Sequence, residues 1–324
     1  MNAIATKNHH TNTFKWLLKR EFWENRGGFL WAPLITGIIA AFFAATAALI
    51  ATLIGRKHNV NVGTDAAEIV RTAGQVGDGA LLVGIGLTMA VLAFVVFFYS
   101  LGSLYDDRRD RSILFWKSLP VSDTQMVLSK LAWALLLAPL LALATGLLTG
   151  LAFWLIAALA SMFNGIPGAS GLLTHSHPLS IIGNVLLAFP VQVLWSLPAV
   201  GWLLLCSAWA KRFPFLWSVL IPFLFCAMAG LVTLVFKISA DIELPYVKLL
   251  YVVLYRGLVS VVPATWLPTM EADFGPVHDP SDLATYMGSS WQVLGHADIW
   301  IGVAAGIAMI YLAIHMRRWR ELAD

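Results

Sequence analysis

The sequence predicts an all-α, polytopic membrane protein with six transmembrane helices. Of the 324 residues, 59% are hydrophobic and 12% are charged, against about 45–50% and about 25% in soluble domains. The charged residues are spaced widely enough to leave long apolar windows, and a charge at the bilayer centre costs several kcal/mol. Lys and Arg gather in particular connections, which orients the spans. These observations predict one transmembrane domain over residues 1–324.

Each uncharged window is long enough for one helix, because about 20 residues cross the hydrocarbon core. The longest window, 131–210, holds two spans. A cluster of turn-forming residues divides it, from Asn164-Gly-Ile-Pro to His175-Ser-His-Pro. The six predicted spans are about 29–54, 80–105, 131–162, 181–209, 213–236 and 298–316.

The segment 246–267 challenges this count, because it is apolar but contains Lys248, Arg256 and Pro263. A seventh span would move the basic cluster around Arg317 to the opposite side from the other basic connections. The positive-inside rule therefore favours six spans with both termini cytoplasmic. We expect 246–267 to be helical, and either re-entrant or interfacial, within an outer region over 237–297.

An amphipathic interfacial helix is predicted over 13–27, before the first span. Its apolar face consists of Phe14, Leu17, Leu18 and Phe22, and Lys15, Lys19 and Glu24 lie away from that face. Such a helix lies along the lipid headgroups. It is either a simple anchor or an elbow that transmits motion.

The loop 106–130 carries alternating charges over 106–111, followed by an apolar run over 113–119. Pro120 ends this short helix, since its ring cannot continue the hydrogen-bond ladder. Ser122 or Asp123 then caps the helix that enters the third span. An ordinary cytoplasmic loop explains the arginines but not the apolar run. That run must bury against the membrane surface or a partner protein.

This loop resembles the connection between the second and third spans of bacterial type 2 ABC-transporter permeases. The resemblance rests on the run Ser-Ile-Leu-Phe-Trp-Lys-Ser-Leu-Pro-Val-Ser-Asp and the following Val-Leu-Ser-Lys-Leu. The matching positions are Leu119, Pro120, Val121, Ser122 and Lys130. The interfacial helix, the six spans and the outer re-entrant region resemble the family's layout. Asp106, Asp107 and Asp110 stand where many members have Glu and Gly, which leaves the subfamily and substrate open.

The resemblance implies the membrane subunit of an exporter in the bacterial cytoplasmic (inner) membrane. Its cytosolic coupling helix would dock on a separate ABC ATP-binding subunit, and a second copy or a similar permease would complete the pathway. ATP and Mg²⁺ would be bound by the partner. The expected docking contacts are Asp110, Arg111, Leu114, Trp116, Lys117, Leu119 and Pro120.

Motifs for chemistry within this chain are absent from the sequence. It contains no phosphate-binding loop, no His-Glu-x-x-His and no Gly-x-Ser-x-Gly. We therefore expect no catalytic, cofactor-binding or metal-binding residue, no enzymatic activity and no nucleic-acid partner. His175 and His177 are interpreted as loop histidines. Gly84-x-Gly86 is interpreted as a small-residue helix contact.

Apart from Asp298 at the first position of the last one, the predicted spans contain no Asp, Glu, Lys or Arg, which disfavours an ion-coupled carrier. An amphipathic or lipid-like substrate suits such a pathway, with membrane lipids around it. Asn184, Gln192 and Ser196 either line the pathway or join helices. The alternatives are a membrane enzyme acting on lipid-linked substrates, or a non-transporting scaffold. An enzyme would draw on the ionisable residues of the outer region: Asp241, Glu243, Glu271, Asp273, His278, Asp279, Asp282 and His296.

Overall fold

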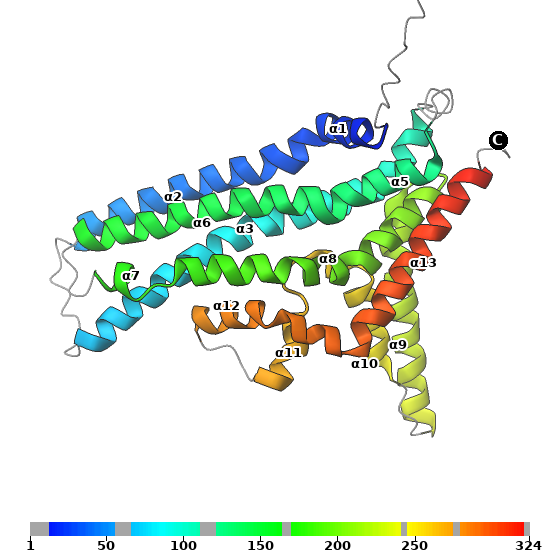
Figure 1. The fold of residues 1–324 in the computed structure, drawn as a ribbon. Helices are drawn as coiled ribbons and strands as arrows, with labels where there is room; N and C mark the ends of the chain where they lie inside the picture. Colours follow the sequence, from blue (N-terminus) through cyan, green and yellow to red (C-terminus); the bar gives the residue numbers. More distant parts are fainter. Residues whose placement is uncertain are drawn as a thin grey trace, which may run out of the picture.

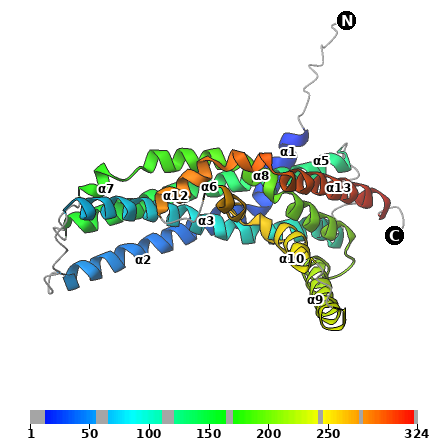
Figure 2. The same ribbon diagram turned by 90° about the horizontal axis from the view of Figure 1, so that it is seen from below.

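The protein is an all-α, polytopic membrane protein with six helices long and apolar enough to cross a membrane. The computed structural model describes residues 13–55, 66–110, 121–163, 170–240, 245–274 and 279–320, and these contain helices but no strand. The first four spans lie side by side along most of their length (Figure 1). The fifth span leaves this group at a steep inclination, and both views show it (Figure 2).

The spans are assembled from the following elements. The first three are α1 (Thr13–Arg26) continued by η1 (Gly27–Trp31) and α2 (Ala32–Gly55), then α3 (Ala66–Arg109), then α5 (Asp123–Ala132) with η2 (Trp133–Leu137) and α6 (Ala138–Phe163). The last three are α8 (Pro178–Trp209), η3 (Leu216–Leu220) with α9 (Ile221–Ala240), and α13 (Ala297–Arg320). The shorter elements are α7 (Gly171–Thr174), α10 (Tyr246–Leu250), η4 (Tyr251–Arg256), η5 (Val259–Val261), α11 (Leu267–Phe274), α12 (Pro280–Gly288) and η6 (Ser290–Gly295).

The segment 246–267 does not cross as a continuous helix. It is divided into α10, η4 and η5, and none of these is long enough to span a bilayer. Arg256 at the end of η4 is 6% exposed and donates from Nη1 to the carbonyl of Trp195 in α8 at 3.1 Å. The segment therefore enters the helical bundle, and the prediction of six spans is confirmed.

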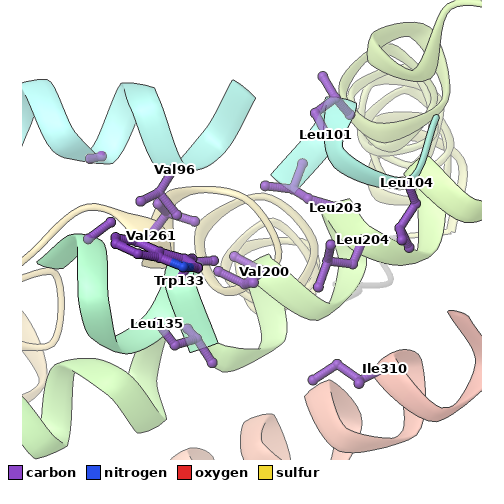
Figure 3. Packing of buried hydrophobic residues seen from close by; sticks show 14 of the residues in the cluster. Val96, Leu101, Leu104, Trp133, Leu135, Val200, Leu203, Leu204, Val261 and Ile310 are labelled. Carbon is purple, nitrogen blue, oxygen red and sulfur yellow. The ribbon is translucent and has the colours of Figure 1, made fainter. Parts of the chain in front are cut away.

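The main apolar core lies between α3, η2, α8 and α13. Figure 3 shows Val96, Trp133, Val200 and Ile310 converging from these four elements. Within the most apolar window of each span, 44% of residues are buried in α3 and in α5–α6, but only 6% in α1–α2 and 11% in η3–α9. The exposed apolar faces of α2 and α9 are suited to lipid.

The spans α3 and α6 cross at close range. A Cβ added at Gly84 would lie 2.5 Å from the Cα of Gly150, whereas a Cβ at Gly86 would meet nothing within 4 Å. The small-residue contact predicted for this pair therefore holds for Gly84 alone. Gly86 lines a cavity instead.

Three spans contain a wide π-helical turn: η1, η2 and η3. In η1 the N–H of Ala32 bonds to the carbonyl of Gly27, five residues earlier. A proline follows each turn after one further residue: Pro33, Pro139 and Pro222. A proline inside an α-helix clashes with the carbonyl four residues before it. The wide turn accommodates that clash, and the helix continues.

The helix that carries the second predicted span is longer than that span, and it includes a charged residue. We expected the second span to begin near residue 80, after Asp78, but α3 begins at Ala66. Asp78 is 3% exposed, and its Oδ1 accepts the backbone N–H of His177 at 2.8 Å. The carboxylate thus joins the start of α8 to α3 and does not mark a helix end.

Candidate functional site

The most densely charged buried part of the described structure lies at one end of the bundle. There α1, the C-terminal end of α3, α5 and the C-terminal end of α13 meet (Figure 1). We call this group the ion cluster. It consists of Arg20, Glu21, Asp107, Asp123, Lys130 and Arg317.

Lys130 is at the centre of the ion cluster. Its Nζ lies 3.0 Å from Oε1 of Glu21 on α1 and 3.3 Å from Oδ2 of Asp107 on α3. Arg317 on α13 approaches the same Asp107 oxygen with Nη1 at 3.6 Å. A fourth contact joins Arg20 Nη2 to Asp107 Oδ1 at 3.8 Å. One carboxylate therefore ties α3 to three other elements.

Four of the six members of this cluster are buried, whereas Arg20 and Asp123 are partly exposed. The exposed fraction is 2% for Glu21, 3% for Lys130, 5% for Arg317 and 7% for Asp107. Burying charges costs several kcal/mol per ion, and this cost is offset only when the charges are closely paired. Such a group stabilises one arrangement of the four elements and penalises any arrangement that separates them.

Aromatic contacts hold α1 against the same elements. The indole Nε1 of Trp133 donates to the carbonyl of Leu18 at 2.8 Å, and its ring stacks on Phe22 at 5.5 Å. Tyr99 donates its hydroxyl to Glu21 Oε2 at 2.7 Å. The predicted apolar face of α1 therefore packs on protein, and its lipid-facing candidates are the exposed Trp16 and Trp23.

Arg317 also links the two ends of the connection between α3 and α5. Its Nη1 contacts Asp107 near the end of α3, and its Nε lies 3.4 Å from Oδ1 of Asp123, the first residue of α5. On the other side, Arg108 donates to the carbonyls of Ser207 and Ala210 at the end of α8, the second at 3.0 Å. The residues on both sides of the connection therefore contact other helices: α13 through Arg317, and the end of α8 through Arg108.

The predicted docking residues fall mostly within that connection. The expected loop over 106–130 is shorter, because α3 extends to Arg109 and α5 begins at Asp123. Ser122 is the cap, since its Oγ accepts the N–H of Gln125 at 3.2 Å. Asp110 forms the turn that ends α3. The other predicted contacts lie outside the described residues: Arg111, Leu114, Trp116, Lys117, Leu119 and Pro120.

The sequence interpretation missed the pairing of Glu21, Lys130 and Arg317. One signal was available, because Glu21 follows Leu17 by four residues and so lies on the apolar face of α1. A carboxylate on a face that packs inward requires a buried cation. The identity of the cation that pairs with the Glu21 carboxylate depends on contacts between distant parts of the chain. The spacing of residues in the sequence does not predict those contacts.

A second feature is a cavity of about 200 Å³ between α3, α6, α8 and the segment after η5. Gln192 and Ser196 border it, together with apolar residues such as Met89 and Trp266. Ser196 donates to the carbonyl of Gln192 at 2.8 Å, and Asn184 contacts α12 beside Gly288. Asn184 therefore joins helices, whereas Gln192 and Ser196 lie at the cavity.

Two of the ionisable residues that the enzyme alternative would draw on have a structural role instead. Asp279 and Asp282 form a capping box at the start of α12, in which the N–H of Asp279 donates to Asp282 Oδ2 at 3.1 Å. Asp241, Glu243 and His278 lie outside the described residues. Within the described part of the chain, no group of three or more His, Cys, Asp or Glu is arranged to hold a metal ion.

No protein-family model, curated protein or solved structure matches this chain. Any functional conclusion therefore rests on the residues and their geometry, together with the resemblance of the connection before α5.

Proposed function

We propose that this chain is the membrane-spanning permease subunit of an ATP-driven ABC exporter in the bacterial inner membrane, with both termini in the cytoplasm. The observation that carries the proposal is the double contact of Arg317, which links both ends of the α3–α5 connection to the last span. A segment anchored in this way transfers an applied displacement to the spans instead of absorbing it.

The ATP-binding subunit would dock on the apolar run over 113–119, and it would hold ATP and Mg²⁺. Closure of two such subunits would displace the docked segments of two permease copies, or of this chain and a similar permease. Because Asp107 is shared by α1, α5 and α13 through the ion cluster, that displacement would reach three spans together. Work is transmitted only if the contacts differ between the two states of the transporter.

The test is assembly of the purified protein with its candidate ATP-binding subunit. Trp116→Ala removes an aromatic anchor of the expected docking face, and Leu119→Asp places a charge on it. Buried aromatic anchors contribute about 2 kcal/mol or more to interfaces, so we expect the affinity for the ATPase subunit to fall roughly 30-fold. Substrate-stimulated ATP hydrolysis by the complex should fall with it.

Trp291→Ala is the matched control, because Trp291 is an exposed tryptophan (47%) of η6, away from the ion cluster. This variant should assemble normally and retain full ATP hydrolysis. Unchanged assembly and hydrolysis in both docking variants would contradict the assignment of residues 113–119 as the coupling helix. Failure of the wild-type chain to bind any ATP-binding subunit would contradict the proposal itself.

A further inference from the structure

A buried cation lies beside the middle of α8 and the start of α13, away from the ion cluster. Arg256 is 6% exposed, and its guanidinium lies over the ring of Trp195, with Cζ 3.7 Å from the ring centroid. Its Nη1 donates to the carbonyl of Trp195 at 3.1 Å. Its Nη2 is also buried, and the described residues offer it no hydrogen-bond partner. A guanidinium remains charged in proteins, so an unmet N–H here carries part of a positive charge.

The chain makes room for this guanidinium on α13. A Cβ added at Gly302 would lie 2.2 Å from Nη2 of Arg256, so only glycine permits the approach. Burial lowers the pKa of Arg256, which reflects loss of hydration, and Tyr251 and Asp298 oppose that change. The guanidinium is desolvated, and in the described residues no carboxylate forms an ion pair with it.

Arg256 forms part of the wall of a partly open groove of about 560 Å³ between α8, the start of α9, η4 and α13. Along α13 the groove extends from Asp298 past Gly302 to Met309, which is about 16 Å at 1.5 Å per residue. Most of the other lining side chains are apolar, including Phe225 and Ile301. The groove therefore combines a charged end with a long apolar wall.

Two further polar groups define the charged end. The hydroxyl of Tyr251 is buried without a hydrogen-bond partner among the described residues. Burial raises the pKa of Tyr251, so its hydroxyl stays protonated and can donate. Asp298 also lines the groove, but it is exposed. It precedes Gly302 by four residues and so lies on the same face of α13, one helical turn away.

We propose that this groove binds an aminophospholipid, with the lipid phosphate on Arg256 and Tyr251 and the ammonium group on Asp298. The buried cation and the exposed carboxylate match the two charges of such a headgroup. An anionic lipid without an ammonium group would satisfy Arg256 but place a negative charge near Asp298. One acyl chain would follow α13 from Gly302 towards Met309. This site is independent of the proposed transport function, because it involves neither the ATP-binding partner nor residues 111–120.

The test measures lipid binding to the full chain in detergent by native mass spectrometry. The titrated lipids are phosphatidylethanolamine and phosphatidylglycerol with identical acyl chains. We expect tighter binding of phosphatidylethanolamine. Arg256→Gln should weaken both lipids roughly tenfold, because charge-assisted hydrogen bonds to phosphate are lost. Lys248→Gln is the matched control, since it removes the same charge from an exposed residue of α10, and it should leave both affinities unchanged.

Asp298→Asn tests the ammonium contact at an exposed position that does not endanger folding. It should weaken phosphatidylethanolamine and spare or strengthen phosphatidylglycerol, so the ratio of the two affinities falls. An unchanged ratio would overturn the assignment to an aminophospholipid. Full lipid binding by Arg256→Gln would overturn the site altogether. Phosphoethanolamine without acyl chains should bind far more weakly, and binding as tight as that of the lipid would exclude the apolar wall from the site.

Discussion

Replacing Lys130 with methionine should strongly destabilise the protein, because it removes the cation at the centre of the ion cluster. Methionine keeps an unbranched apolar stem of similar length and removes only the ammonium group. Glu21 is then left with the Tyr99 hydroxyl as its hydrogen-bond donor. Asp107 keeps the more distant guanidinium groups of Arg20 and Arg317.

The magnitude follows from the burial of the partners. The side chains of Lys130 and Glu21 are 4% and 2% exposed, so water does not screen their interaction. Breaking a buried ion pair by removing one partner costs about 3–5 kcal/mol. The ratio of folded to unfolded protein should therefore fall by roughly two to four orders of magnitude. An exposed cation on α1, the helix of Glu21, provides the control: Lys19→Met should change stability by less than about 0.5 kcal/mol.

Reversible unfolding by sodium dodecyl sulfate in mixed micelles, followed by tryptophan fluorescence, gives the free energy of unfolding for each variant. A double-mutant cycle with Glu21→Gln then isolates the pair. We expect the loss in the double variant to be smaller than the sum of the single losses by about 1–3 kcal/mol. If Lys130→Met is as mild as Lys19→Met, or if the two changes are additive, the ion cluster does not hold α1 against α3 and α5.

Two further changes address other contacts. Arg317→Lys keeps the charge but loses the planar guanidinium that reaches two carboxylates. In the wild type, Asp123→Asn should lower the free energy of unfolding by about 0.5–1 kcal/mol. In the Arg317→Lys variant, the same Asp123→Asn change should have almost no effect on the free energy of unfolding, measured by the same assay. Gly84→Ala should destabilise the protein by about 1–3 kcal/mol, because its Cβ would meet the backbone of Gly150 at 2.5 Å. Gly86→Ala, with open space around the new methyl group, should be neutral or slightly stabilising, and equal effects of the two alanines would contradict the close crossing of α3 and α6.

Much of the fold follows from local sequence, because hydrophobicity and charge act residue by residue. The apolar windows define the six spans, the cap at Ser122 follows from turn chemistry, and the apolar face of α1 follows from its period. The start of α3 does not follow from local sequence, because Asp78 is buried and accepts the backbone N–H of His177, the residue before α8. A charge marks a helix boundary only when water is its partner, and Asp78 has a protein partner.

The candidate site was less accessible from sequence. The charges of 106–111 indicate a cytoplasmic connection, but the ion cluster is formed by residues from four separate elements. Glu21, Lys130 and Arg317 are distant in the chain, and only tertiary packing brings them together. The same holds for Arg256, which the sequence presents as an obstacle to a seventh span. Its role depends on the space left by Gly302 on α13.

The wide turn η2 has a consequence for the angular phase of the third span. Lys130 and Gly150 belong to one continuous helix, and both face α3, through Asp107 and Gly84 respectively. In an uninterrupted α-helix, 20 residues at about 100° each would rotate the side-chain direction by about 200° beyond five full turns, which leaves the two directions roughly 160° apart. The extra residue in η2 reduces this offset to about 100°. The π-helical turn thereby lets a single helix present its charged end and its glycine contact to the same neighbour.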